Sequence, residues 1–250
     1  MPEETILETR DLVKEFAGFV AVNGVSLRVA RGSIHALIGP NGAGKTTVFN
    51  LLTRFLPATR GAILFKGDDV THARPAEVAR RGIVRSFQMS AVFPALTALE
   101  NVRVALQRPL GTSFHFWRSE RTLDALEARA VELLAAVGLE ADRDTVAVEL
   151  PYGRKRALEL ATTLALDPEL LLLDEPTQGM GHEDVGRVVA LIRRVAAGRT
   201  VLLVEHNLSV VQDLARRVTV LARGAVLAEG SYDEVSRDPA VLEAYIGATP

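Results

Sequence analysis

Short apolar segments alternate with helical patterns along most of this chain, and the alternation limits the folds open to it. The segments Ser33–Ile38, Leu170–Leu173 and Thr200–Val204 are mostly apolar and are bounded by polar residues. Strands of this kind are typical of a largely parallel sheet that is covered on both faces. The pattern therefore predicts an α/β fold with a mainly parallel central sheet.

Further strand-like segments have hairpin character, which favours antiparallel pairing. Three lie near the start of the chain, and two flank the turn Arg223-Gly224: Ile6–Leu12, Val25–Val29, Ala62–Phe65, Val218–Leu221 and Ala225–Ala228. We expect these five segments to form an antiparallel β subdomain beside the main sheet.

The stretch from Ser90 to Asp167 lacks strand patterns. The helical period dominates there over Arg118–Val137 and Lys155–Leu166. We therefore expect one domain, 1–250, whose α/β core and β subdomain occupy 1–89 and 168–250. A helical subdomain would be inserted at 90–167.

A glycine-rich turn follows the first apolar strand and precedes a helical pattern, the setting in which G-x-x-x-x-G-K-[ST] binds phosphate. Its residues are Gly39, Pro40, Asn41, Gly42, Ala43, Gly44, Lys45, Thr46 and Thr47. Glycines let successive backbone N–H groups face phosphate oxygens, and the helix dipole adds positive potential. Lys45 would contact the β and γ phosphates, and the Thr46 hydroxyl would coordinate Mg²⁺. The segment predicts a nucleoside triphosphatase or a kinase.

Two carboxylates, Asp174 and Glu175, end the segment of four leucines. The carboxyl ends of parallel strands are where such sheets bind ligands. Asp174 would hold the Mg²⁺ shell, and Glu175 would act as general base on the attacking water. Gln88, after the apolar stretch 82–87, is a candidate metal or water ligand. His206 follows another strand end, where it can hydrogen-bond a γ-phosphate.

These motifs occur in the order that is typical of the ABC ATPases, and the resemblance covers essentially the whole chain. It includes a signature-like segment formed by Leu150, Pro151, Tyr152, Gly153 and Arg154. The resemblance implies a P-loop fold of the RecA-like type, binding of ATP with Mg²⁺, and ATP hydrolysis. It also implies that Phe16 stacks on adenine with Val22 beside the ring, that Gln88 senses the metal and the membrane subunit, and that His206 is the switch histidine.

The resemblance further implies a head-to-tail pair of ATPase subunits, in which the signature segment serves the partner's ATP. Such a hetero- or homodimer would drive two membrane permeases and, indirectly, a periplasmic solute-binding protein. The segments SFQMSAVFPALTALENV and GSYDEVSRDPAVLEAYIG resemble the longer ATPase paralogue of branched-chain amino acid uptake systems. Two departures stand out: Pro151 and Tyr152 replace the usual serine and glycine of the signature, and Gly181 stands where an aspartate is common.

Composition and the N-terminus restrict where such a protein acts. The formal net charge of −2 argues against binding nucleic acid through a dominant basic surface, so we expect no nucleic-acid partner. The absence of cysteine excludes disulfides and thiolate sites. MPEETILETRDL lacks signal-peptide features, and no apolar run approaches the roughly 20 residues that a membrane span needs. We expect peripheral attachment at the cytoplasmic side of a bacterial inner membrane.

Three functions remain open to the sequence. The first is an importer ATPase for branched-chain or other hydrophobic amino acids. The second is an ABC ATPase for another cargo, such as urea or lipopolysaccharide, because cargo is chosen by other subunits. The third is a soluble ABC-type ATPase that acts on DNA or ribosomes, although such proteins usually carry a long coiled-coil insertion or two cassettes.

Overall fold

A six-stranded sheet forms the centre of the computed structural model, which describes residues 4–86, 92–107 and 126–246. The strand order is β11-β10-β4-β9-β8-β7, with β11 antiparallel to β10 at one edge and every other pairing parallel. The bounds are β4 Ile34–Ile38, β7 Ile83–Ser86, β8 Leu170–Asp174, β9 Thr200–Val204, β10 Arg217–Ala222 and β11 Ala225–Gly230. The parallel sheet that the apolar segments predict is therefore present.

Side chains of the central strands alternate between two cores, one on each face of the sheet. On β8, Leu171 and Leu173 pack with the large helices, whereas Leu170 and Leu172 pack with helix α1 and the antiparallel strands. All four leucines are buried. Each fully buried leucine stabilises the fold by roughly 1.5–3 kcal/mol, which is why a strand buried on both faces is mostly apolar.

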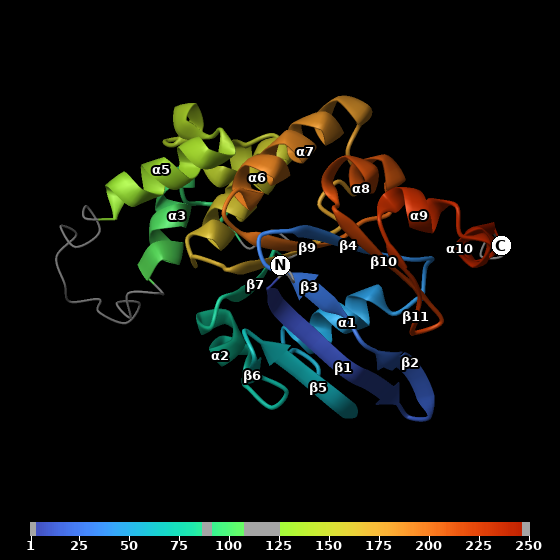
Figure 1. Ribbon diagram of the computed structural model, residues 1–250. Helices are drawn as coiled ribbons and strands as arrows, with labels where there is room; N and C mark the ends of the chain where they lie inside the picture. The colour runs from blue at the N-terminus through green and yellow to red at the C-terminus, as the bar shows by residue number, and fades with distance from the viewer. Residues whose placement is uncertain (1–3, 87–91, 108–125, 247–250) are drawn as a thin grey trace.

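A second, antiparallel sheet lies on the α1 side of the main sheet (Figure 1). Its long strand β1 pairs with β2, β3 and β5, and β5 also pairs with β6. The bounds are β1 Thr5–Phe16, β2 Phe19–Val25, β3 Arg28–Ala30, β5 Arg60–Phe65 and β6 Asp68–Asp69. The antiparallel subdomain predicted from the N-terminal segments is present.

The hairpin around Arg223-Gly224 was wrongly expected in that subdomain. It exists, but β10 joins the main sheet through parallel pairing with β4, from Arg217 opposite His35 to Val220 opposite Ile38. The physical reason is burial, because Val218 and Val220 are fully buried against Ala36, Ile38 and the C-terminal helices. Hairpin geometry at the turn is compatible with either sheet, so the sequence did not distinguish them.

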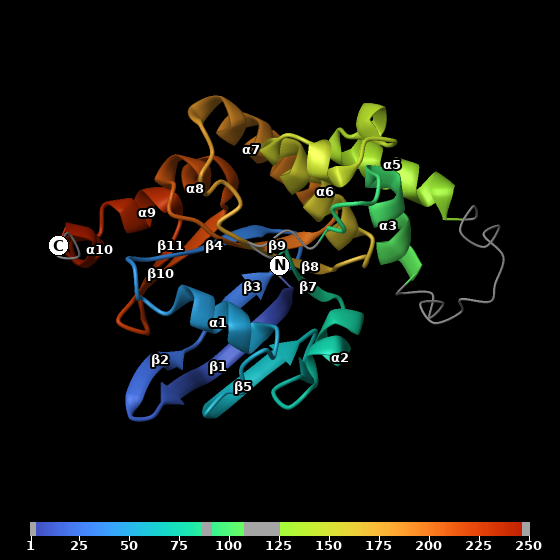
Figure 2. The same ribbon diagram turned by 180° about the vertical axis from the view of Figure 1, so that it is seen from behind.

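Helices cover both faces of the main sheet (Figures 1 and 2). Helix α1 lies between the two sheets, and helices α6, α7 and α8 lie on the opposite face. The bounds are α1 Lys45–Leu52, α2 Pro75–Arg80, α3 Ala98–Gln107, α5 Glu127–Val137, α6 Tyr152–Leu164, α7 His182–Ala196, α8 Leu208–Leu214, α9 Tyr232–Ser236 and α10 Pro239–Ile246, with short 3₁₀ turns at Glu140–Asp142 and Ala147–Glu149. No helix within these described ranges is long and apolar enough to cross a membrane.

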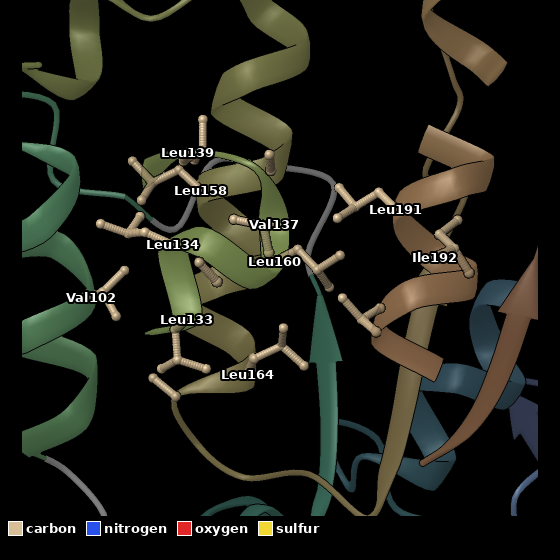
Figure 3. Close-up of a cluster of buried hydrophobic side chains, with 14 of the residues drawn as sticks. Val102, Leu133, Leu134, Val137, Leu139, Leu158, Leu160, Leu164, Leu191 and Ile192 are labelled. Carbon is tan, nitrogen blue, oxygen red and sulfur yellow. The ribbon is translucent and has the colours of Figure 1, made fainter. Parts of the chain in front are cut away.

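Helices α3, α5 and α6 follow one another between β7 and β8 and share a leucine-rich core (Figure 3). Leu134 of α5 and Leu158 of α6 are fully buried there, and Leu191 and Ile192 of α7 extend the same cluster to the main sheet. The division into a core and a helical subdomain at 90–167 stays a proposal, because one continuous core joins these helices to the sheet.

Candidate nucleotide site

The predicted site segments lie together at the carboxyl ends of the parallel strands of the main sheet. Leu37 of β4 lies opposite Val204 of β9, and Val204 lies opposite Asp174 of β8. The three residues lie within two positions of the glycine-rich loop, of His206 and of Glu175 respectively. This alignment brings three distant parts of the sequence to the carboxyl ends of the strands, where α/β sheets bind ligands.

The glycine-rich loop runs from β4 into α1 in a tight turn. Gly44 precedes α1 with φ 101°, and a Cβ atom there would lie 2.6 Å from the carbonyl oxygen of Ala21. Side chains other than hydrogen are therefore excluded both by the backbone angle and by β2. Helix α1 begins at Lys45, so its first backbone N–H groups lie at the end of this loop, an arrangement that favours anion binding.

Lys45 is nearly buried within this loop. Its Nζ donates to the carbonyl oxygens of Gly39, at 2.6 Å, and Pro40, at 3.0 Å. Burial lowers the pKa of Lys45, and the nearby carboxylates of Glu175 and Asp174 oppose that shift. The next residue, Thr46, is exposed on the first turn of α1. The lysine charge and the threonine hydroxyl thus stand at the helix N-terminus, where a polyphosphate would lie.

Asp174 is the buried member of the acid pair, and one of its two carboxylate oxygens is held by Arg85. Arg85 of β7 donates to Asp174 Oδ2, and its other terminal nitrogen donates to Asn50 Oδ1 at 2.6 Å. The second oxygen, Asp174 Oδ1, is buried and has no hydrogen-bond partner among the described residues. An oxygen ligand that is buried and unsatisfied fits a hard cation such as Mg²⁺.

Glu175 adopts a backbone conformation that is rare for a residue with a side chain. Its φ is 47°, in the left-handed region, and its backbone N–H donates to Val204 O at 2.8 Å. Its Oε1 accepts a hydrogen bond from His206 Nε2 at 2.7 Å. Because a carboxylate only accepts, the Nε2 atom carries the proton in this contact. Strained backbone of this kind is concentrated at functional sites.

A polar cavity of about 560 Å³ opens beside this pair. Its lining includes Asn41 of the glycine-rich loop, Glu175, Gln178 and His206. The cavity therefore joins the phosphate loop to the residues that follow β8 and β9.

The two residues predicted to contact adenine lie on the paired strands β1 and β2. Phe16 ends β1 opposite Phe19, is 42% exposed, and has Lys14 Nζ 4.8 Å above its ring centroid. Val22, in contrast, is fully buried on β2 next to Gly44. Gln88 lies outside the described residues, so its predicted role is not tested.

The signature-like segment forms the N-terminus of α6. Pro151 is the N-cap residue, and the exposed Tyr152 donates from its hydroxyl to Gln178 O at 3.3 Å. Arg154 forms an ion pair with Asp142, and Leu150 is buried. The segment thus contacts the loop that follows the acid pair.

Two polar residues of the site were missed in the sequence. Arg85 is the one charged residue of strand β7, and that charge next to Ile83 and Val84 was the available signal. Glu205 precedes His206 at a strand end, as Asp174 precedes Glu175, and it is 3% exposed. The rule that drew attention to His206 applied equally to Glu205.

The fold and the phosphate loop together define the class as a P-loop nucleotide-binding protein. A family model described as ABC transporter matches residues 22–178. A second, described as branched-chain amino acid ATP-binding cassette transporter, matches residues 225–249. This chain belongs to the ABC transporter family, as an ATP-hydrolysing cassette, and the resemblance seen in the sequence is confirmed.

Individual relatives cover almost the full length. The chain is 39% identical over 252 residues to the high-affinity branched-chain amino acid transport ATP-binding protein BraF of Pseudomonas aeruginosa, covering 97% of this chain and 98% of that protein. It is 36% identical to the corresponding protein LivG of Salmonella typhimurium, covering 98% of each. The ADP conformation of MJ1267, an ATP-binding cassette of an ABC transporter, superposes with a TM-score of 0.85 at 32% identity, covering 97% of this chain and 99% of that one.

Proposed function

We propose that this chain hydrolyses Mg-ATP to drive uptake of branched-chain or other hydrophobic amino acids. The cargo is proposed from the match of residues 225–249 to the branched-chain family model. Full-length relatives whose names state branched-chain amino acid transport support it. Cargo is selected by other subunits, so the chain itself would supply only the ATP-driven movement.

In this proposal the two acids of β8 have different tasks. Asp174 and the Thr46 hydroxyl hold Mg²⁺, with Gln88 as a further ligand, and the bound ion neutralises phosphate charge. Glu175 accepts the proton of the water that attacks the γ-phosphate. His206 donates to Glu175 in the structure, which fixes the direction of that carboxylate.

The nucleotide itself would be held by the loop and by the β1–β2 hairpin. The backbone N–H groups of 41–47 and the Lys45 ammonium bind the phosphates. Phe16 supports this arrangement because it exposes its ring at the end of β1, where an adenine base could stack.

We infer an assembly in which two cassettes each present residues 150–154 to the other's ATP. The exposure of Tyr152 and the open N-terminus of α6 support this role. Pro151 has neither a hydroxyl nor an N–H, so α6 must offer its own backbone N–H groups instead. The assembly would include two permeases, and the cassettes would act at the cytoplasmic side of the inner membrane. A periplasmic binding protein would deliver the solute to the permeases.

The test is a pull-down of the tagged chain from its own membranes, followed by mass spectrometry. Recovery of two permeases, a second ATPase subunit and an amino-acid-binding protein would support the proposal. Recovery of permeases with a urea- or lipid-binding component would contradict the cargo alone. Recovery of ribosomal or DNA-bound proteins in place of permeases would contradict transport altogether.

A further inference from the structure

Glu205 is a buried acid beside the proposed catalytic pair that the mechanism above does not use. Glu205 directly follows β9, precedes His206 and is 3% exposed. Burying a carboxylate is costly unless hydrogen-bond donors compensate for the lost water. The donors around Glu205 therefore indicate what it does.

The Glu205 carboxylate accepts four hydrogen bonds. Oε1 accepts from the backbone N–H of Thr177, at 2.9 Å, and from the Thr177 hydroxyl, at 2.6 Å. Oε2 accepts from the backbone N–H groups of His206, at 3.0 Å, and Asn207, at 3.2 Å. One carboxylate thus joins the loop that follows β8 to the loop that follows β9.

The two loops are those that carry Glu175 and His206. Thr177 lies two residues after Glu175, whose left-handed φ of 47° needs support from its surroundings. On the other side, Asn207 caps helix α8 by accepting from Ser209 N at 3.1 Å. The His206 backbone is therefore held between the Glu205 carboxylate and the start of a helix.

We propose that Glu205 is a positioning residue for ATP hydrolysis, which clamps both loops so that His206 Nε2 meets the Glu175 carboxylate. The inference rests on the proposed roles of Glu175 and His206. Glu205 is not itself the base, because both of its oxygens already accept two hydrogen bonds each. Its effect on turnover passes through the 2.7 Å contact between His206 and Glu175.

Glu205→Gln tests the clamp with little change in volume. One acceptor oxygen becomes an NH₂ group that faces N–H or O–H donors, so at least one loop is released. We expect kcat of the full-length chain in its membrane complex to fall about 10- to 100-fold, the scale of misplacing a reacting group. The Kd for ATP should stay within about threefold, since the four hydrogen bonds of Glu205 go to Thr177, His206 and Asn207 and none goes to Lys45 or its loop.

Thr177 supplies a conservative rescue. Thr177→Ser keeps the hydroxyl donor to Glu205, whereas Thr177→Val removes it at nearly the same volume. Only the valine variant should lower kcat, and it should add little to Glu205→Gln, because residues acting as a unit are not additive. Glu159→Gln, which removes a buried acid paired with Arg156 in α6, is the matched control for loss of stability alone.

His206→Ala separates the inference from the proposed function. In that background Glu205→Gln should cost less than about threefold in kcat, because the contact it protects is already gone. Unchanged kcat in Glu205→Gln, with turnover lost in His206→Ala, would overturn the inference and leave the proposed function standing. Full turnover in His206→Ala would instead contradict the proposed role of His206, and the inference with it.

Discussion

At the residue scale, Lys45 and Glu175, two charged side chains of the proposed nucleotide site, differ in how they are held. Lys45 is held by two backbone carbonyl oxygens of its own loop. Glu175 depends on other segments, because Val204 accepts from its backbone and His206 donates to its side chain. Substitution of Lys45 should therefore affect mainly ATP binding, and substitution of Glu175 should affect mainly the hydrolysis step.

Glu175→Gln should leave ATP binding within about threefold while turnover falls by at least about 10²-fold, the usual value of a general base. Lys45→Ala should weaken ATP binding by about tenfold or more, because it removes a hydrogen bond from a charged donor. Calorimetric titration with ATP, alongside phosphate release, measures both. Persistent hydrolysis in Glu175→Gln, or unchanged affinity in Lys45→Ala, would contradict the respective role.

His35 is a residue outside the site that makes stability depend on pH. It is fully buried on β4, and its Nε2 lies 2.8 Å from Thr219 Oγ1 on β10. Burial lowers the pKa of His35 to about 4, while Glu229 raises and Arg217 lowers it by smaller amounts. The folded state therefore keeps this ring neutral at pH values where the unfolded chain binds a proton.

The free energy of unfolding should fall as pH drops from about 6.5 toward 4, and His35 alone accounts for about 2 kcal/mol at pH 5 relative to pH 7.5. Near pH 7.5 and above the ring is neutral in almost all molecules of both states and contributes almost no slope. Urea unfolding at the two pH values, for the natural chain and for His35→Gln, measures the difference. An equal loss of stability in both proteins would assign the slope to other groups.

At the scale of elements, local pattern determined which strands exist but not always their neighbours. Thr200–Val204 forms β9 with the predicted bounds, because a run of only five residues that is apolar on both faces favours a buried strand. The β10–β11 hairpin was placed in the wrong sheet, since pairing of β10 with β4 is a contact between distant segments. Arg85 escaped notice for the same reason, because Asp174 and Asn50 come near it only in the folded chain.

Helix α6 provides a test of the core between the helices and the sheet. Leu158 is fully buried in the leucine cluster, so Leu158→Ala should lower the free energy of unfolding by about 2–5 kcal/mol. Leu242→Ala makes the same substitution at a side chain that is 48% exposed on α10, and it should cost less than about 1 kcal/mol. Similar unfolding midpoints for the two variants would contradict the packing described here.

At the scale of the whole molecule, the two sheets meet at the glycine-rich loop. The turn between β10 and β11 contacts that loop and β2 at once: Gly224 N donates to Ala43 O at 3.1 Å, and Gly224 O accepts from Asn23 N at 2.7 Å. Gly224 has φ 80°, and a Cβ atom there would lie 2.8 Å from Ala21 O. The loop is therefore supported by a residue that lies 181 positions after Ala43 in the chain.

That support has a consequence for recombining cassettes from different transporters. The segment that matches the branched-chain family begins at residue 225, directly after Gly224. A chimera that joins a foreign tail at this boundary inherits the glycine and keeps both contacts of the turn. A junction placed a few residues earlier would import a foreign turn, and any residue other than glycine at 224 would press on β2 behind the phosphate loop. Tails can be exchanged between cassettes as modules only when the turn stays with the loop that it supports.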